Sequence, residues 1–179
     1  MKILVTGGAG FIGSAAVRNL VSRKDYKVLC IDKMTYAASL ESIESVMNND
    51  SFDLEVFDVA SKERISKILR KFQPDKILHL AAETHVDRSI DKAHHFIRSN
   101  ISGAYSILEA IRKFEKKTKK KLKLLQVSTD EVYGDIPKNK KANEDHNYNP
   151  SSPYSASKAG ADQFIKSYGR TYGIKIIIA

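Results

Sequence analysis

Short apolar runs rich in β-branched residues recur along the chain, and stretches with helical periodicity separate most of them. The runs predict strands at Lys2–Thr6, Lys27–Asp32, Phe52–Asp58, Lys76–Ala82, Leu122–Ser128 and Ile174–Ala179. The first four start roughly 25 residues apart, which is the spacing of repeated strand–helix–strand units. Helical periodicity predicts helices at Phe11–Arg23, Ser61–Phe72, Ala93–Phe114 and Ser152–Gly173. Ser61 and Ser152 are expected N-caps, and Gly173 is expected to end the last helix.

This alternation predicts an α/β fold, a doubly wound parallel sheet with helices on both faces. The 179 residues suffice for one domain with a real core. One long irregular segment, Gly134–Ser152, has a length typical of a functional loop. The last run stops at Ala179, inside what reads as an interior strand. We therefore expect either a truncated chain or a partner that covers the exposed strand edge.

Composition narrows the class of protein. Hydrophobic residues make up 42% of the chain, as in globular proteins. The single cysteine, Cys30, lies in an apolar run and is expected to be a buried hydrophobe. One thiol excludes an intrachain disulfide and the multi-cysteine zinc sites. No apolar leader opens the chain, and no apolar run approaches the ~18 residues of a membrane span. We expect a soluble, cytoplasmic protein without a membrane partner.

The net charge is +9, from 30 basic and 21 acidic residues, and part of the excess lies in Arg112–Lys123. A basic patch can attract nucleic acid. This run, however, has one aromatic residue and no nucleic-acid motif. We interpret it as the solvated end of a helix, where cations suit the helix dipole, and expect no nucleic-acid partner.

A glycine-rich turn follows the first strand and opens the first helix. Gly7, Gly10 and Gly13 have the spacing that permits a tight turn, close approach of the backbone to a pyrophosphate, and close helix–strand packing. Asp32 closes the second strand, where a carboxylate accepts hydrogen bonds from ribose hydroxyls and repels a 2′-phosphate. The pattern predicts a dinucleotide site that prefers NAD to NADP, although the neighbouring Lys33 weakens that preference. The alternative is a glycine turn without a ligand.

Two further groups of residues suggest chemistry. Tyr154 and Lys158 lie four apart near a helix start, on one face. An ammonium at ~4 Å stabilises the phenolate by about 4 kcal/mol at an effective dielectric of ~20, which brings the tyrosine pKa toward neutral pH. The alternative is a chance surface pair. Asp130 and Glu131 follow the fifth strand directly, either as a polar loop or as acid and base groups at the mouth of a site.

The stretches TGGAGFIGS, IDKMTYAASLESI, HLAAETHVDRSI, VSTDEVYGD and NPSSPYSASKAGAD span nearly the whole chain. With them the chain resembles the extended short-chain dehydrogenase/reductase family and, within it, the dTDP-glucose 4,6-dehydratases. The glycine turn and the Tyr/Lys pair are shared with many sugar-nucleotide epimerases and dehydratases. The stretches DKMTYA, AAETHVDRSI and STDEVYGD are more specific.

The resemblance implies a Rossmann-type domain over residues 1–179 that binds NAD and carries the catalytic residues. The implied cofactor-binding residues are Gly7, Gly10, Phe11, Ile12, Gly13, Asp32, Lys33, Thr35, Asp58, Val59, Leu80, Ala81, Ala82, Ser99, Tyr154 and Lys158. The implied substrate is the nucleotide sugar dTDP-glucose, which Thr84 and Thr129 contact. The two long helices, Ala93–Phe114 and Ser152–Tyr172, resemble those of the family's dimer interface, so a homodimer is expected.

The resemblance also implies a reaction. Tyr154 takes the proton of the sugar 4-hydroxyl as hydride passes to NAD. Glu131 then removes the proton from carbon 5, and Asp130 protonates the departing 6-hydroxyl. Hydride returns to carbon 6, and the product is a 4-keto-6-deoxy sugar. Thr129 hydrogen-bonds the 4-hydroxyl, and Lys158 completes the catalytic set.

The chain departs from the family pattern in three respects. Thr84 replaces an expected serine and Ser99 an expected threonine, and both keep the hydroxyl. The family's C-terminal part, which holds the nucleotide sugar, is not in this chain. Two alternatives therefore stay open, a related 4-epimerase or dehydratase and a non-catalytic NAD-binding fragment. No set of His, Asp or Cys residues suggests a metal site, and we expect no metal.

Overall fold

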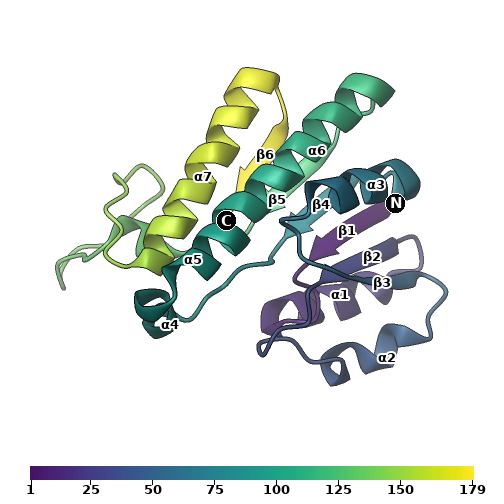
Figure 1. The fold of residues 1–179 in the computed structure, drawn as a ribbon, viewed down its shortest axis with the longest axis horizontal. Helices are drawn as coiled ribbons and strands as arrows, with labels where there is room; N and C mark the ends of the chain where they lie inside the picture. Colours follow the sequence, from purple (N-terminus) through teal and green to yellow (C-terminus); the bar gives the residue numbers. More distant parts are fainter.

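Six parallel strands form one sheet in the order β3-β2-β1-β4-β5-β6 in the computed structural model, which describes residues 1–179 (Figure 1). The strands are β1 Lys2–Thr6, β2 Lys27–Asp32, β3 Phe52–Val56, β4 Lys76–His79, β5 Lys123–Gln126 and β6 Lys175–Ile178. All six predicted strands are present. Several end earlier than the apolar runs do, because the last residues of those runs leave the sheet at its carboxyl edge.

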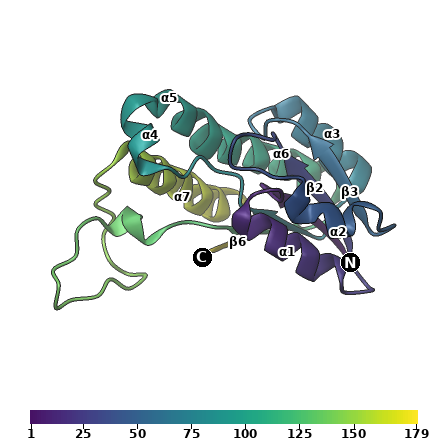
Figure 2. The same ribbon diagram turned by 90° about the horizontal axis from the view of Figure 1, so that it is seen from below.

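Helices cover both faces of the sheet, so the predicted doubly wound fold is confirmed (Figure 2). They are α1 Phe11–Val21, α2 Glu44–Met47, α3 Lys62–Phe72, α4 Val86–Asp91, α5 Ala93–Phe96, α6 Gly103–Thr118 and α7 Pro153–Tyr172. The larger core cluster lies under α3, α6 and α7, where Leu4, Ile77 and Leu124 face these helices. The smaller one lies under α1 and α2 and includes Val5 and Cys30, the latter buried as expected.

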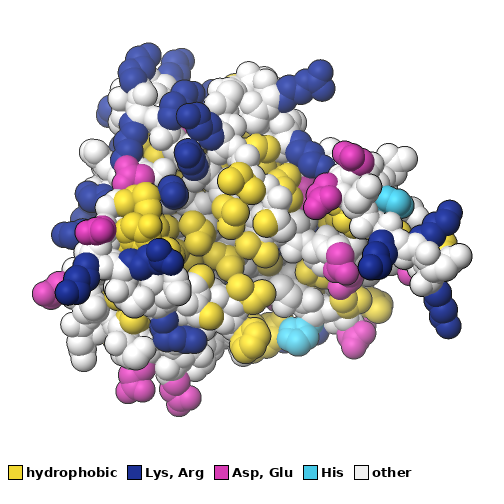
Figure 3. Space-filling model, turned by 180° about the vertical axis from the view of Figure 1, so that it is seen from behind, with side chains coloured by type: hydrophobic (Ala, Val, Ile, Leu, Met, Phe, Trp, Pro, Cys, Tyr) yellow, Lys and Arg dark blue, Asp and Glu magenta, His cyan; other side chains and the backbone are white.

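The two faces are covered unequally. Leu78, Leu125 and Ile177 are paired in register across β4, β5 and β6. Strand alternation directs them away from the face that α6 and α7 cover. Leu78 and Leu125 are partly buried, whereas Ile177 is 57% exposed. Figure 3 shows this side of the molecule, where hydrophobic side chains gather at the centre.

The predicted helix Ala93–Phe114 is interrupted. Its middle, Ile97–Ser102, is a π-helical segment between α5 and α6. Within it the buried Asn100 amide donates to Glu83 O at 3.0 Å and to Ser157 Oγ at 2.8 Å, and its Oδ1 accepts from Glu83 N at 2.8 Å. A π segment turns side chains out of α-helical register and is frequent at functional sites. Here it ties the loop after β4 to α7.

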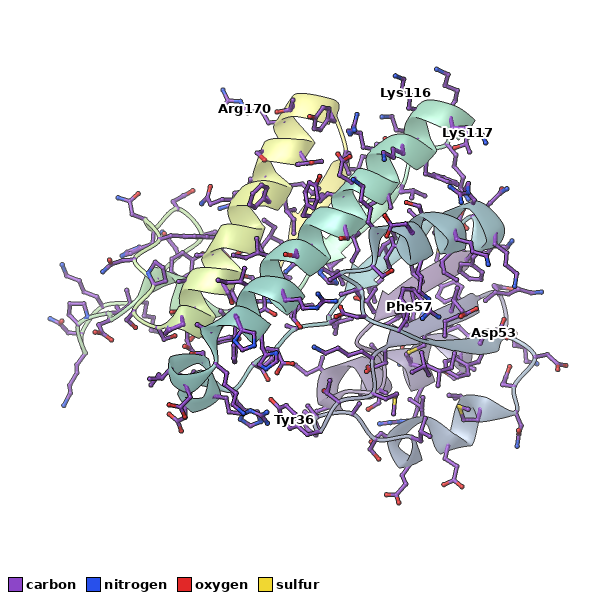
Figure 4. All side chains as sticks on the ribbon, in the orientation of Figure 1. Tyr36, Asp53, Phe57, Lys116, Lys117 and Arg170 are labelled. Carbon is purple, nitrogen blue, oxygen red and sulfur yellow. The ribbon has the colours of Figure 1, made fainter.

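The helix ends agree only in part with the sequence predictions. Ser152 forms a capping box with Ser155, and Gly173 ends α7 with φ of 67°. Ser61 stands at the N-cap of α3, but its side chain makes no capping hydrogen bond. The basic run lies at the end of α6, as predicted, where Lys116 and Lys117 point away from the sheet (Figure 4).

His79 on β4 is buried, and its Nδ1 lies 2.6 Å from Thr6 Oγ1. Burial and, to a lesser extent, the charge of Lys158 lower the pKa of His79 from 6.5 to about 3. In the unfolded chain His79 binds a proton below about pH 6.5, whereas in the folded chain it stays neutral down to about pH 3. The free energy of unfolding therefore decreases as the pH drops below 6.5.

We expect the free energy of unfolding to decrease by about 1.5 kcal/mol between pH 6.5 and pH 5 because of His79 alone. His79→Gln removes the titrating group and should flatten this part of the profile, although it weakens the fold at pH 7. Urea unfolding at both pH values measures the effect. The matched control is His146→Gln, at an exposed histidine. An equal loss of stability in His79→Gln and the wild type would contradict the assignment.

Candidate active site

One cavity of about 580 Å³ lies at the carboxyl ends of the strands, beside the glycine turn. Its walls come from the ends of β1, β2, β4 and β5, from the start of α1 and from α7. The lining residues are Gly7, Gly10, Phe11, Ile12, Gly13, Asp32, Lys33, Thr35, Ala37, Ala38, Phe57, Asp58, Val59, Leu80, Ala81, Ala82, Thr84, His85, Ser99, Val127, Ser128, Tyr154 and Lys158. Every residue predicted to bind the cofactor is among them, as is Thr84. Thr129, Asp130 and Glu131 are not.

The glycine turn brings backbone against backbone. Gly7 has φ of +72°, and a Cβ there would lie 2.6 Å from the backbone nitrogen of Ala81. A Cβ on Gly13 would overlap the carbonyl oxygen of Gly7. Gly10 is the N-cap of α1 and has no side chain to satisfy the first-turn N–H groups. These groups and the positive helix end face the cavity and can hold an anion such as a phosphate.

Asp32 is held by two backbone donors. Its Oδ2 accepts from Ala9 N at 3.0 Å, and its Oδ1 accepts from Met34 N at 2.9 Å. The side chain is buried at the end of β2, yet it lines the cavity. Each carboxylate oxygen has further lone pairs for hydroxyl donors. The cradle for an anion and this carboxylate are the two features that a dinucleotide requires at its pyrophosphate and its adenosine ribose.

A polar cluster joins two loops at the cavity wall. Sequence reasoning named two of its members, Lys33 and Ser99, but not their pairing. Lys33 Nζ donates to Glu83 Oε1 at 3.0 Å and to Ser99 Oγ at 2.7 Å. Tyr36 Oη donates to Glu83 Oε2 at 3.2 Å, and the Arg88 guanidinium lies 3.7 Å from the Tyr36 ring centroid. Figure 4 labels Tyr36 near α4. These residues are about 50 positions apart in the chain, so no local pattern pairs them.

Tyr154 and Lys158 are both buried on α7. Burial raises the pKa of Tyr154, the hydrogen bond with Thr129 lowers it, and the carboxylates of Glu131 and Asp130 raise it. The expectation that Lys158 lowers this pKa is wrong for this structure. Lys158 Nζ instead donates to the carbonyl oxygen of Val127 at 2.5 Å.

Lys158 is itself perturbed. Burial lowers its pKa from 10.5 to about 8, and the charge of Asp162 acts in the opposite direction. Near pH 8 only part of the molecules therefore carry a charged Lys158, which weakens its effect on neighbouring groups. Asp162 was not singled out from the sequence, because one acid inside an amphipathic helix gives no signal of burial.

The acids after β5 lie at the rim of the cavity. Asp130–Tyr133 form a 3₁₀ turn, and Thr129 Oγ1 accepts from Glu131 N at 3.3 Å as its cap. Asp130 and Glu131 are exposed, whereas the hydroxyl of Thr129 reaches Tyr154. The turn therefore presents two solvated carboxylates close to the tyrosine. This arrangement is suited to proton transfer with a ligand that enters from outside.

No group of three or more His, Cys, Asp or Glu side chains is arranged to hold a metal ion. None of the helices combines the length and the apolar character that crossing a bilayer requires.

The comparison with family models matches residues 4–179 to GDP-mannose 4,6 dehydratase. Among curated relatives, dTDP-glucose 4,6-dehydratase of Shigella flexneri is 45% identical over 191 residues, covering 99% of this chain and 53% of the relative. The Haemophilus influenzae enzyme of the same name is 44% identical over 183 residues, covering 99% and 54%. This chain thus spans about half the length of the curated relatives it matches. The resemblance inferred from the sequence is confirmed.

Solved structures of a dehydratase and of an epimerase are also similar to this chain. The dTDP-glucose 4,6-dehydratase DesIV from Streptomyces venezuelae, with NAD and TYD bound, has a TM-score of 0.91 at 37% identity and is covered over 54% of its chain. UDP-glucose 4-epimerase of Thermus thermophilus, in complex with NAD, has a TM-score of 0.86 at 31% identity, also over 54% of its chain. Both alignments cover 99% of this chain.

Proposed function

Because the chain belongs to the GDP-mannose 4,6 dehydratase family, we propose that it is the cofactor-binding and catalytic part of an NAD-dependent nucleotide-sugar 4,6-dehydratase. The proposed substrate is dTDP-glucose, and the proposed product is dTDP-4-keto-6-deoxyglucose. The observation that carries the proposal is the position of Asp130 and Glu131 beside Tyr154, at the rim of the cavity. The glycine turn and Asp32 of that cavity have the features that a dinucleotide requires.

We propose NAD as the cofactor. The free N–H groups at the start of α1 suit its pyrophosphate, and the Asp32 carboxylate suits its adenosine ribose. Lys33 gives no support to a 2′-phosphate, because its ammonium is already paired with Glu83. The bound NAD supplies a hydride acceptor for sugar carbon 4 and a hydride donor for carbon 6.

In the proposed reaction each side chain moves or orients a proton. Tyr154 accepts the 4-hydroxyl proton, and Thr129 orients that hydroxyl. Glu131 takes the proton on carbon 5, which the adjacent ketone has made acidic. Asp130 gives a proton to the 6-hydroxyl, and water leaves. Burial holds the pKa of Tyr154 high, so ligand binding must lower it before the phenol can act as a base near neutral pH.

A second function has specific support. Two similar structures are UDP-glucose 4-epimerases in complex with NAD, with TM-scores of 0.86 and 0.84. A 4-epimerase uses a tyrosine and a bound NAD but does not need an acid and a base for elimination. The two carboxylates after β5 and the 45% identity to a dehydratase favour dehydration. We further propose that residues 1–179 form one domain. Binding of the nucleotide sugar is then largely the function of a further part of the protein.

We also propose a homodimer. Ile97, Tyr105 and Phe164 on or beside the long helices are 54%, 38% and 44% exposed, which is high for large hydrophobic side chains. Light scattering should give twice the mass of one chain, and a monomer over a broad concentration range would exclude the dimer.

The function is tested by titrating the protein that carries this chain with NAD and then assaying it with dTDP-glucose. Binding of NAD and formation of a 4-keto-6-deoxy sugar support the proposal. A 4-epimer as product supports the epimerase, and NAD binding without turnover supports a non-catalytic part. Absence of NAD binding would overturn all three.

A further inference from the structure

Asp162 on α7 is a buried carboxylate that the proposed reaction does not use. Its side chain has 0% exposure. Its Oδ2 accepts hydrogen bonds from Ser128 Oγ and, at 3.2 Å, from Tyr148 Oη. Its Oδ1 is buried without a partner. Burial of a carboxylate destabilises the fold unless neighbouring groups stabilise its charge, so the surroundings of Asp162 are informative.

The partners of Asp162 come from separate parts of the site. Ser128 directly precedes Thr129, so its hydrogen bond anchors the end of β5 from which the catalytic turn starts. Tyr148 belongs to the segment Gly134–Ser152, and its ring packs at 5.4 Å against Tyr133 of that turn. Lys158 lies one helical turn before Asp162 on the same helix, and the Asp162 charge favours its ammonium form.

We propose that Asp162 is a positioning residue, whose carboxylate anchors the catalytic turn through Ser128 and Tyr148 and keeps Lys158 charged. The role rests on the proposed function, because it acts through residues that the reaction would use. Asp162 is not itself among the residues that line the cavity, although it contacts Ser128, which is, and it is distinct from the acids at the rim.

The other titratable groups near Lys158 and Asp162 are consistent with this role of Asp162. His79 on β4 faces Lys158 and is neutral above about pH 3. Tyr154, one turn earlier on α7, is neutral because burial raises its pKa. Lys166 adds a second positive charge near Asp162 and donates to Tyr148 Oη at 3.1 Å. Asp162 is thus the carboxylate whose charge favours the Lys158 ammonium, against the effect of burial.

The test measures the protonation of Lys158 directly. An amine-acylating reagent modifies only the neutral amine, and peptide mass spectrometry gives the labelling of Lys158 as a function of pH. Asp162→Asn keeps the shape and an acceptor for Ser128 or Tyr148 but removes the charge. We expect its labelling midpoint to move to lower pH by about one unit, which raises labelling at pH 7 about fivefold.

Asp53→Asn is the matched control. It makes the same chemical change on β3, at the other edge of the sheet, and Figure 4 shows Asp53 on the opposite side of the picture from α7. Asp162→Glu retains the charge and should keep the midpoint of the wild type. Thermal unfolding of each variant separates a shift in protonation from a loss of fold.

If Asp162→Asn does not fold, the double variant Ser128→Ala with Tyr148→Phe supplies the test. Loss of both donors raises the pKa of Asp162, so part of its charge is lost and the Lys158 midpoint moves in the same direction by less. A midpoint that stays at the wild-type value in either variant would overturn the proposal.

Cofactor binding is measured separately from the labelling of Lys158. Asp162→Asn should bind NAD about tenfold more weakly at pH 8 than at pH 6.5, and the wild type should show a smaller difference. Failure of the wild type to bind NAD would count against the proposed function. It would leave the labelling result for Asp162 intact.

Discussion

Replacing Glu131 by glutamine in the protein that carries this chain is expected to slow formation of the 4-keto-6-deoxy sugar by about 10²–10⁴-fold, the usual contribution of a positioned acid or base. Glutamine keeps the size of the side chain but cannot accept the proton from carbon 5. Oxidation at carbon 4 depends on Tyr154, which is unchanged, so a single turnover should still reduce bound NAD. Absorbance of the reduced nicotinamide and chromatography of the sugar measure the two steps.

Asp135→Asn is the matched control for this variant, because Asp135 is another exposed acid shortly after the 3₁₀ turn. Its rate should match that of the wild type. Asp130→Asn should also impair elimination, since an amide cannot protonate the leaving hydroxyl. Formation of the 4-keto-6-deoxy sugar at an undiminished rate in Glu131→Gln would contradict the role of Glu131 as the base. A 4-epimer as the product of the wild type would favour the 4-epimerase.

Replacing Gly13 by alanine is expected to reduce the free energy of unfolding by roughly 2–4 kcal/mol and to lower the melting temperature by roughly 5–15 °C. The added Cβ would overlap the carbonyl oxygen of Gly7, and backbone cannot move aside as a flexible side chain can. The turn would have to open, so NAD binding should be lost as well. Thermal unfolding and an NAD titration measure both effects.

Gly10→Ala separates binding from folding. A Cβ at Gly10 would approach only the Gly7 carbonyl oxygen, at 3.3 Å, and φ of −78° suits any residue. We expect stability close to that of the wild type. NAD binding should nevertheless be at least about tenfold weaker, because the methyl group enters the space that a pyrophosphate needs. Equal stability of Gly13→Ala and Gly10→Ala would contradict the packing argument.

The geometry around Tyr154 changes the interpretation of the Tyr/Lys pair. Spacing along a helix predicted that both side chains share a face, which is a local property. It could not predict that the ammonium of Lys158 turns to the carbonyl oxygen of Val127, since that residue lies just after β5, 31 positions earlier in the chain. Burial lowers the pKa of Lys158 and the charge of Asp162 opposes that shift, yet the sequence shows Asp162 only as one more acid in a helix.

The sequence by itself determined the parts that depend on local patterns. Apolar runs and helical periodicity determined the six strands and most of the helices, and the glycine spacing located the turn whose residues line the cavity. The tertiary structure alone decided the contacts between distant segments: Lys33 with Glu83, Asn100 with Ser157, and Asp162 with Ser128. Burial and pKa depend on what the folded chain brings together, and residues tens of positions apart leave no periodic signal of their meeting.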